Sequence, residues 1–199
     1  MCDRLDVDVW EVVEAAKTKP FGYMPFYPGP GLGGHCIPID PRYLAWKMKT
    51  LNYNARFIQL AEEVNFSMPE YVIHKIGGAL NDTCKALKGS QILIVGVTYK
   101  ADIGDLRESP ALDIMHILHE QGANVAYHDP HAPRVLIDGW SLATVELTAE
   151  VLQSADCVVI TTAHTSYDWQ WVVDNSRLII DTRNVTSRVT PGAGRIVKL

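Results

Sequence analysis

The sequence has few of the features that mark membrane, secreted or nucleic-acid-binding proteins. Its 199 residues contain no apolar run near the roughly 18 residues that a membrane helix needs. Only four cysteines are present, far apart and without a CxxC pair, and no charged and apolar leader opens the chain. We therefore expect a cytoplasmic protein with free thiols. The net charge of −5 argues against nucleic acid as a partner, and we expect no membrane partner either.

What is present is the composition of a folded protein. Hydrophobic residues make up 47% of the chain and charged residues 21%, which excludes a disordered or collagen-like chain. Charge divides the chain unevenly, because residues 1–88 hold ten basic and ten acidic residues whereas 89–199 hold eight and thirteen. We predict two domains, 1–88 and 89–199, with the boundary at Lys88–Gly89–Ser90.

The first region reads as helices around one long loop. Apolar spacing predicts helices over Leu5–Ala16, from Asp40-Pro41 to Thr50, and over 56–87, the last with a kink or a new start at Ser67–Glu70. Residues 20–41 hold six prolines and five glycines, a composition that disfavours both helix and central strand. The segment is also rich in aromatic residues, so we expect an ordered loop, and long ordered loops often carry function.

The second region alternates strands with helices. Strands are predicted at 91–95, 124–128, 157–161, 178–180 and 195–198, and helices at 110–120, 148–153 and 167–174. This alternation indicates βα units, and so an α/β fold with a Rossmann-like parallel sheet. Ligands bind such sheets beyond the carboxyl ends of the strands. The polar segments at those ends are Thr98–Arg107, Asp129, Thr161–His164 and Asp181–Asn184.

The turn after the first of these strands lacks a dinucleotide fingerprint. Of the three glycines in G-x-G-x-x-G, only Gly96 is present. Lys100 and Arg107 lie in the same turn and could meet phosphate charge. The turn therefore indicates a nucleotide other than a dinucleotide, or else an ordinary solvated loop.

Cys36 is the cysteine whose surroundings suggest chemistry. It lies in the segment GGHCIPID, and a thiol at the start of a helix can be activated as a nucleophile. A buried, inert thiol is the alternative. Cys84 and Cys157 fall in a predicted helix and a predicted strand, and both are read as inert. His116 and His119 share a helical face without further ligands, so we expect no metal site.

Two segments together resemble the nucleotide-sugar 6-dehydrogenases. Lys19–Leu44, with PFYPGPGLGGHCIPIDPRYL at its centre, resembles the catalytic-cysteine segment of that family. Gly96–Ala111, GVTYKADIGDLRESPA, resembles the start of its C-terminal UDP-binding domain. The form of the first segment is most similar to the branch that acts on UDP-N-acetylglucosamine. His35 and Ile39 depart from the GGSCFPKD-like segment of the UDP-glucose branch.

The resemblance implies the C-terminal part of an NAD-dependent enzyme. The family oxidises the C6 alcohol of a UDP-sugar to a carboxylate with two NAD⁺, here for surface polysaccharide biosynthesis, and dimerises through the region matching 1–88. Its NAD-binding domain and a helix with an assisting lysine and asparagine have no counterpart here, so we expect the chain to be inactive alone. The alternatives are a UDP-glucose or UDP-N-acetylmannosamine dehydrogenase fragment, a non-catalytic UDP-sugar-binding module, and a cysteine hydrolase using Cys36 and His35, for which the sequence shows no third group.

The resemblance also implies roles for individual residues. Cys36 would attack the aldehyde intermediate as a thiolate, Asp40 would orient or activate water, and Arg107 would reach the phosphates of NAD. The residues implied in substrate binding are Tyr27, Gly29, Gly31, Leu32, Gly33, Tyr99, Lys100 and Arg183. No metal is implied.

Overall fold

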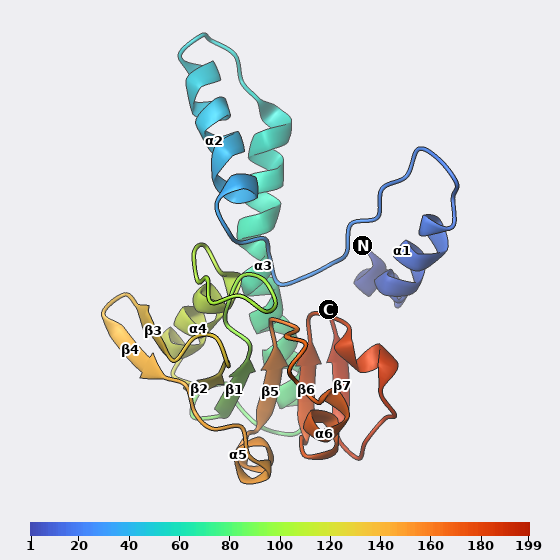
Figure 1. Cartoon of the computed structure of the whole chain (residues 1–199), viewed down its shortest axis with the longest axis vertical. Coiled ribbons are helices and arrows are strands. Elements are labelled where there is room, and N and C mark those ends of the chain that lie inside the picture. The colour runs from blue at the N-terminus through green and yellow to red at the C-terminus, as the bar shows by residue number, and fades with distance from the viewer.

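A five-stranded parallel sheet, in the order β2-β1-β5-β6-β7, forms the centre of residues 89–199 in the computed structural model, which describes residues 1–199 (Figure 1). The helices are α1 (Val9–Lys17), α2 (Cys36–Lys49), α3 (Arg56–Asn81), α4 (Pro110–Glu120), α5 (Ala149–Ser154) and α6 (Trp169–Asp174), with the short 3-10 helices η1 (Cys2–Leu5) and η2 (Val185–Arg188). The strands are β1 (Gln91–Val95), β2 (Asn124–His128), β3 (Arg134–Ile137), β4 (Trp140–Ala143), β5 (Cys157–Ile160), β6 (Leu178–Asp181) and β7 (Arg195–Lys198). The α/β fold with a parallel sheet is thus confirmed.

The sheet is covered on both faces, and its strands divide their side chains accordingly. Because side chains alternate along a strand, Ile92 and Ile94 of β1 join the apolar core beneath α3 and α4. Leu93 and Val95 point the other way, into a second core with α5 and α6. Burial on both faces explains why these strands appear in the sequence as continuous apolar runs.

The two halves of helix α3 lie in different environments. Its C-terminal half packs in the core beneath the sheet, where Val72, Ile76 and Leu80 are fully buried. Its N-terminal half projects with α2 as an arm above the sheet, and Phe57 there is 89% exposed (Figure 1). The predicted boundary at residues 88–90 falls between α3 and β1, although α3 supplies part of the core of the second region. The two-domain division remains a prediction.

The start of α2 differs from the sequence prediction. The helix begins at Cys36, one turn before the predicted Asp40-Pro41 start, so the last part of the proline- and glycine-rich segment is helical. Pro38 lies in the first turn, where backbone N–H groups have no helical partner to lose. Pro41 lies in the second turn and removes only the hydrogen bond to the carbonyl of Ile37. The two prolines therefore cost this helix fewer hydrogen bonds than the proline content of the segment suggests.

Two other helix boundaries differ from prediction. The helix predicted over 56–87 ends at Asn81, because Cys84 adopts a left-handed conformation (φ 57°). The N–H of Lys85 then donates to the carbonyl of Leu80 at 3.0 Å, as in a Schellman motif, so Cys84 lies in a helix-terminating turn. The first predicted helix is interrupted, and α1 starts after Asp8, whose carboxylate accepts from the backbone N–H of Trp10.

The β3–β4 hairpin is absent from the sequence prediction. Asp138 and Gly139 form its two-residue turn, both with positive φ, and Ile137 pairs with Trp140. An Asp-Gly pair between short apolar runs is a hairpin signal that the sequence does contain. By contrast, the predicted bounds of β1, β2, α4 and β7 agree with the structure. No helix has both the length and the apolar character required to cross a membrane.

Replacing Ile76 with alanine should test how far the sheet depends on α3. The Ile76 side chain is fully buried, so we expect Ile76→Ala to lower the free energy of unfolding by about 2–5 kcal/mol. The matched control is Glu63→Ala, on the exposed half of the same helix, which should change it by less than about 0.5 kcal/mol. Urea unfolding followed by circular dichroism measures both. Equal effects of the two substitutions would contradict the packing described here.

Candidate functional site

The loop between α1 and α2 crosses above the carboxyl ends of the strands and docks there through its glycines (Figure 1). The N–H of Gly34 donates to the carbonyl of Arg107 at 2.9 Å. A Cβ atom on Gly33 would lie 2.4 Å from the carbonyl oxygen of Glu108 and 2.7 Å from Cβ of Tyr99. A Cβ on Gly34 would lie 2.9 Å from the Tyr99 ring. The two glycines are therefore required for this close backbone approach.

Asn65, in α3, holds the same loop from the other side. Its side-chain amide accepts from the N–H of Leu32 at 2.7 Å and donates to the Leu32 carbonyl at 3.2 Å. Gly31 fits between α3 and Pro110, and a Cβ there would lie 3.1 Å from the proline ring. Sequence reasoning missed Asn65, since a polar residue in an amphipathic helix carries no signal of such a contact.

Cys36 is the first residue of α2 and is exposed to solvent. His35 precedes it, and Asp40 lies one helical turn further on, with its carboxylate 3.7 Å from Nδ1 of His35. The structure thus places a third group beside Cys36 and His35 where the sequence showed none. Cys36 is therefore not buried, as the alternative interpretation would require.

Arg107 lies close to Cys36 but is already partnered. Its guanidinium donates to both carboxylate oxygens of Asp105, at 2.6–3.1 Å. Hydrogen bonding to Asp105 raises the pKa of Arg107, and Cys36 is near enough to add to that shift. The backbone of Arg107 contacts the loop two residues before Cys36, so the charge of Arg107, paired with Asp105, lies near the segment that leads to the thiol.

A small cavity lies under the docked loop, between the carboxyl ends of the strands. Its lining comes from the loop, the turn after β1, the start of α4, and the segments after β5 and β6: Pro30, Gly31, Thr98, Tyr99, Ser109, Pro110, Ala111, Thr161, Thr162 and Arg183. Helix α4 begins at Pro110, so its N-terminus adjoins this cavity. The N-terminus of a helix favours anions such as phosphate. The arrangement suits a polar, negatively charged ligand.

Arg183 reaches this site from the segment after β6. A Cβ on Gly29 would lie 2.6 Å from Nη1 of Arg183, so the guanidinium contacts the loop backbone. Asp181 holds the turn by accepting from the backbone N–H groups of Arg183 and Thr186, at 2.9 and 2.8 Å. Although part of the Arg183 side chain remains exposed, desolvation by the surrounding segments lowers its pKa.

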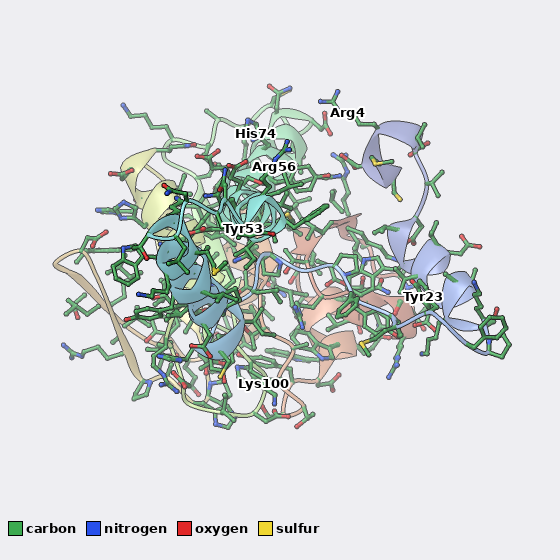
Figure 2. All side chains as sticks on the ribbon, turned by 90° about the horizontal axis from the view of Figure 1, so that it is seen from above. Arg4, Tyr23, Tyr53, Arg56, His74 and Lys100 are labelled. Atoms are coloured by element: carbon green, nitrogen blue, oxygen red, sulfur yellow. The ribbon has the colours of Figure 1, made fainter.

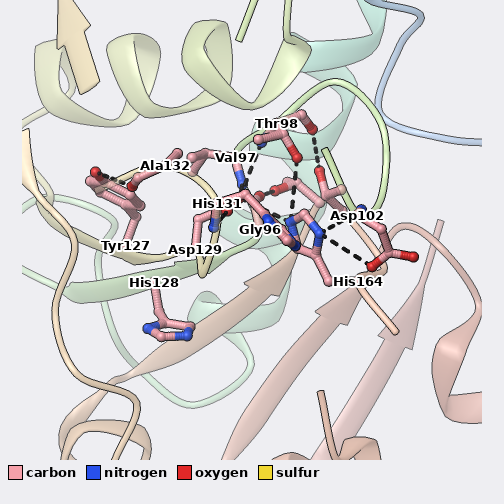
Figure 3. Close-up of polar contacts among 12 residues, drawn as sticks. Gly96, Val97, Thr98, Asp102, Tyr127, His128, Asp129, His131, Ala132 and His164 are labelled. Atoms are coloured by element: carbon pink, nitrogen blue, oxygen red, sulfur yellow. Dashed lines mark hydrogen bonds and ion pairs between the residues drawn. The ribbon is translucent and has the colours of Figure 1, made fainter. Parts of the chain in front are cut away.

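A buried hydrogen-bond network fixes the turn that carries Tyr99 and Lys100 (Figure 3). The Asp129 carboxylate, at the end of β2, accepts from the N–H groups of Val97 and Thr98 at 2.6 and 3.2 Å. His164, after β5, lies 3.0 Å from the same carboxylate through Nε2. Its Nδ1 accepts from the N–H of Asp102 at 2.9 Å, so in this arrangement Nε2 carries the proton and donates it to Asp129. Three neighbouring strand ends are thereby tied together.

Two predicted substrate-binding residues are not brought into this arrangement. The hydroxyl of Tyr27 donates to Glu14 at 2.8 Å and accepts from Lys17 at 3.0 Å, and its ring stacks on Trp10. Tyr27 therefore anchors the loop to α1, which lies to one side of the sheet when seen from above (Figure 2). Lys100 is exposed, at the far end of the turn after β1.

The Asp129 carboxylate should make the stability of the chain depend on pH. Burial alone would raise its pKa, but the hydrogen bonds from His164 and from the backbone N–H groups of Val97 and His131 outweigh burial and lower it to about 2. Because folding lowers this pKa, the ionised carboxylate stabilises the folded state fully at pH values above about 4, the pKa of an unfolded aspartate. This contribution is lost as the pH falls toward 2. We expect the stability difference between the parent chain and Asp129→Asn to narrow by about 1 kcal/mol between roughly pH 6 and pH 3. Urea unfolding at each pH measures it, and a constant difference would contradict the assignment.

Comparison with known proteins assigns both regions of the chain to one family. Residues 1–67 match the model of the UDP-glucose/GDP-mannose dehydrogenase family, central domain, and residues 93–188 match that family's UDP binding domain. A UDP-N-acetyl-D-mannosamine dehydrogenase from Methanococcus maripaludis is 33% identical over all of this chain and 46% of its own length. An NDP-N-acetyl-D-galactosaminuronic acid dehydrogenase from Ralstonia solanacearum is 36% identical over 94% of this chain and 43% of its own.

A solved structure of a nucleotide-sugar dehydrogenase has the same fold. The UDP-D-ManNAc dehydrogenase of Pyrococcus horikoshii superimposes with a TM-score of 0.82 at 28% identity, over 98% of this chain and 44% of its own. The chain thus spans less than half the length of these relatives. The two family matches meet at the contact between the docked loop and the turn after β1. The chain belongs to the UDP-glucose/GDP-mannose dehydrogenase family of nucleotide-sugar dehydrogenases, of which it holds the central and UDP-binding domains.

Proposed function

We propose that this chain supplies the covalent nucleophile and the UDP-sugar site of an NAD-dependent nucleotide-sugar 6-dehydrogenase. The observation that supports this most is the contact of Gly33 and Gly34 with Tyr99 and the Arg107–Glu108 backbone. It brings an exposed thiol at a helix start next to a cavity of the UDP-binding domain. A non-catalytic UDP-sugar-binding module would not need an accessible Cys36 at this point.

The proposed reaction converts the C6 alcohol of the sugar into a carboxylate. Loss of one hydride and one proton gives the aldehyde, and the Cys36 thiolate adds to its carbonyl carbon to form a thiohemiacetal. That carbon again bears a hydrogen, so a second hydride can leave and a thioester results. Water then attacks the thioester and releases the carboxylate and the free thiol. Asp40, one turn from Cys36, would orient or activate this water.

NAD⁺, held by a separate NAD-binding domain, would accept the two hydrides. The residues here fit such an arrangement, because Cys36 and Arg107 are both exposed to solvent. Arg107 would meet the phosphates of the cofactor. Its partner Asp105 would hold the guanidinium in place.

The other proposed contacts go to the UDP-sugar. The loop backbone from Gly29 to Gly33 would surround it, and Tyr99 would line the site beneath. Arg183 offers a positive charge at the cavity, and the start of α4 offers backbone N–H groups for the diphosphate. Lys100 would have to turn toward this site when ligand binds. Tyr27 would act through the position of the loop rather than by touching the sugar.

We propose a UDP-linked 2-acetamido sugar as substrate, in a pathway of surface polysaccharide synthesis. The sequence of the Cys36 segment favours the glucosamine epimer, whereas relatives named UDP-N-acetyl-D-mannosamine dehydrogenase favour the manno epimer. The manno epimer has the stronger support, because those relatives match nearly the whole chain. UDP-glucose is the third candidate.

We further propose that the chain pairs with a second copy through the arm of α2 and α3. Large apolar side chains remain exposed along it: Tyr43, Leu44, Trp46, Phe57, Leu60 and Val64. So much apolar surface on one projecting element is typical of an interface. The far end of the arm, where α2 ends and α3 begins, stands clear of the sheet, so a partner could reach it (Figure 1).

Replacing Phe57 with glutamate should separate the two copies. The Phe57 side chain is 89% exposed in the single chain, and in a dimer it would be buried, where a carboxylate is unfavourable. We expect a dimer for the parent chain and a monomer for Phe57→Glu in sedimentation equilibrium at tens of micromolar. Leu136→Glu is the matched control, since Leu136 is 71% exposed on the β3–β4 hairpin and should leave the dimer intact. A monomeric parent chain would overturn the proposal.

The reaction is tested with the protein that carries this chain together with an NAD-binding domain. NADH formed per sugar should be two, measured by absorbance with UDP-N-acetylmannosamine, UDP-N-acetylglucosamine and UDP-glucose in turn. Cys36→Ser should lower kcat by about a thousandfold or more, because a serine hydroxyl is rarely ionised near neutral pH. Cys84→Ser is the control and should retain turnover. Two NADH per sugar at a normal rate from Cys36→Ser would contradict the covalent role.

A further inference from the structure

Two groups of side chains in this chain have the composition of a metal site. The first is His35, Cys36 and Asp40, whose candidate ligand atoms all lie within 4.8 Å of one another. The second is Asp102, His131 and His164, with the same spread. The surroundings of the two groups differ, and they show which group could bind a cation.

The second group cannot act as a metal site without losing structure. Nδ1 of His164 already accepts from the N–H of Asp102, and Nε2 lies in the contact with Asp129. Both ring nitrogens are therefore occupied, and the ring is fully buried. A cation could bind His164 only by breaking the network that holds the turn after β1.

The first group has its ligand atoms free. Cys36, His35 and Asp40 are exposed, and the one polar contact among them is the 3.7 Å approach of His35 Nδ1 to the Asp40 carboxylate. Cys36 and Asp40 lie four residues apart in α2, so both side chains project from one helical face. That spacing is the one by which two side chains of a helix share a zinc ion. His35 adds a third donor from the residue that precedes the helix.

We propose that His35, Cys36 and Asp40 bind one thiophilic divalent cation, of which Zn²⁺ is the representative. Sulfur, imidazole nitrogen and carboxylate oxygen are the ligand types that zinc prefers, and three protein ligands leave an open position toward solvent. A thiolate and a carboxylate together offset the two charges of the ion. Arg107 opposes a cation here, but its charge is paired with Asp105 at 2.6–3.1 Å.

Binding would remove the proton of the Cys36 thiol and engage the sulfur lone pair that the proposed reaction needs. If Cys36 is the nucleophile, as proposed above, the cation is a reversible inhibitor that a chelator removes. The site itself does not depend on that function, since it requires neither NAD nor a sugar. A failure to find dehydrogenase activity would therefore leave the cation site testable.

Titration of the reduced 199-residue chain with Co²⁺ tests the proposal directly. We expect one equivalent to bind with a near-ultraviolet thiolate-to-cobalt charge-transfer band, and Zn²⁺ to abolish this band by displacement. Cys36→Ser should remove the band, whereas Cys84→Ser and Cys2→Ser should keep it. His35→Gln and Asp40→Asn should each weaken binding by about tenfold or more.

Each of the following outcomes would contradict the proposed cation site. A band that persists in Cys36→Ser would place the cation on another thiol. A band that needs Cys36 but is unaffected by His35→Gln and Asp40→Asn would mean binding by a lone thiolate. Absence of any band, with four thiols titrated as free in the unfolded chain, would show that the three groups do not bind a cation together. Circular dichroism of each variant confirms that the chain is folded.

Discussion

The burial of the C-terminal half of α3 against the parallel sheet determines where the other parts of the molecule lie. Val72, Ile76 and Leu80 bind the helix to the core, so its N-terminal half must leave the sheet at a fixed angle. Asn65 lies on the exposed half, above the buried turns, and holds Leu32 by two hydrogen bonds. The loop that leads into Cys36 is therefore positioned by the same helix that closes one face of the core.

A second constraint acts from the sheet. Parallel strands bring their carboxyl ends to one edge, and Asp129 collects N–H groups there from the turn after β1. Four donors, the backbone N–H groups of Val97, Thr98 and His131 and the imidazole of His164, surround this one buried carboxylate and hold that turn where it meets Gly33 and Gly34. The thiol and the cavity are held by two independent sets of contacts, one from α3 and one from the strand ends.

Local sequence patterns predicted the parts of the fold that depend on local physics. The runs in β1 and β5 are apolar because both faces are buried, and the helix predicted at 110–120 has the bounds of α4. The beginning of α2 was wrong, because proline frequency was weighed without its position in the helical turn. The contacts of Asn65 and the anchoring of Tyr27 to α1 could not be predicted, since each joins segments whose proximity only the fold determines. The roles of Cys36 and Arg107 came from family motifs rather than from spacing.

The contacts that dock the loop onto the turn after β1 have a consequence for how this region can change. The hydrogen bond at Gly34 is accepted by the backbone carbonyl of Arg107, and the close approach at Gly33 is to the carbonyl of Glu108. Both acceptors are backbone atoms, so neither contact uses the side chain of Arg107 or Glu108. An insertion or deletion there would displace the carbonyls themselves. The length of the chain between Tyr99 and Ser109 is therefore a quantity that this turn must preserve.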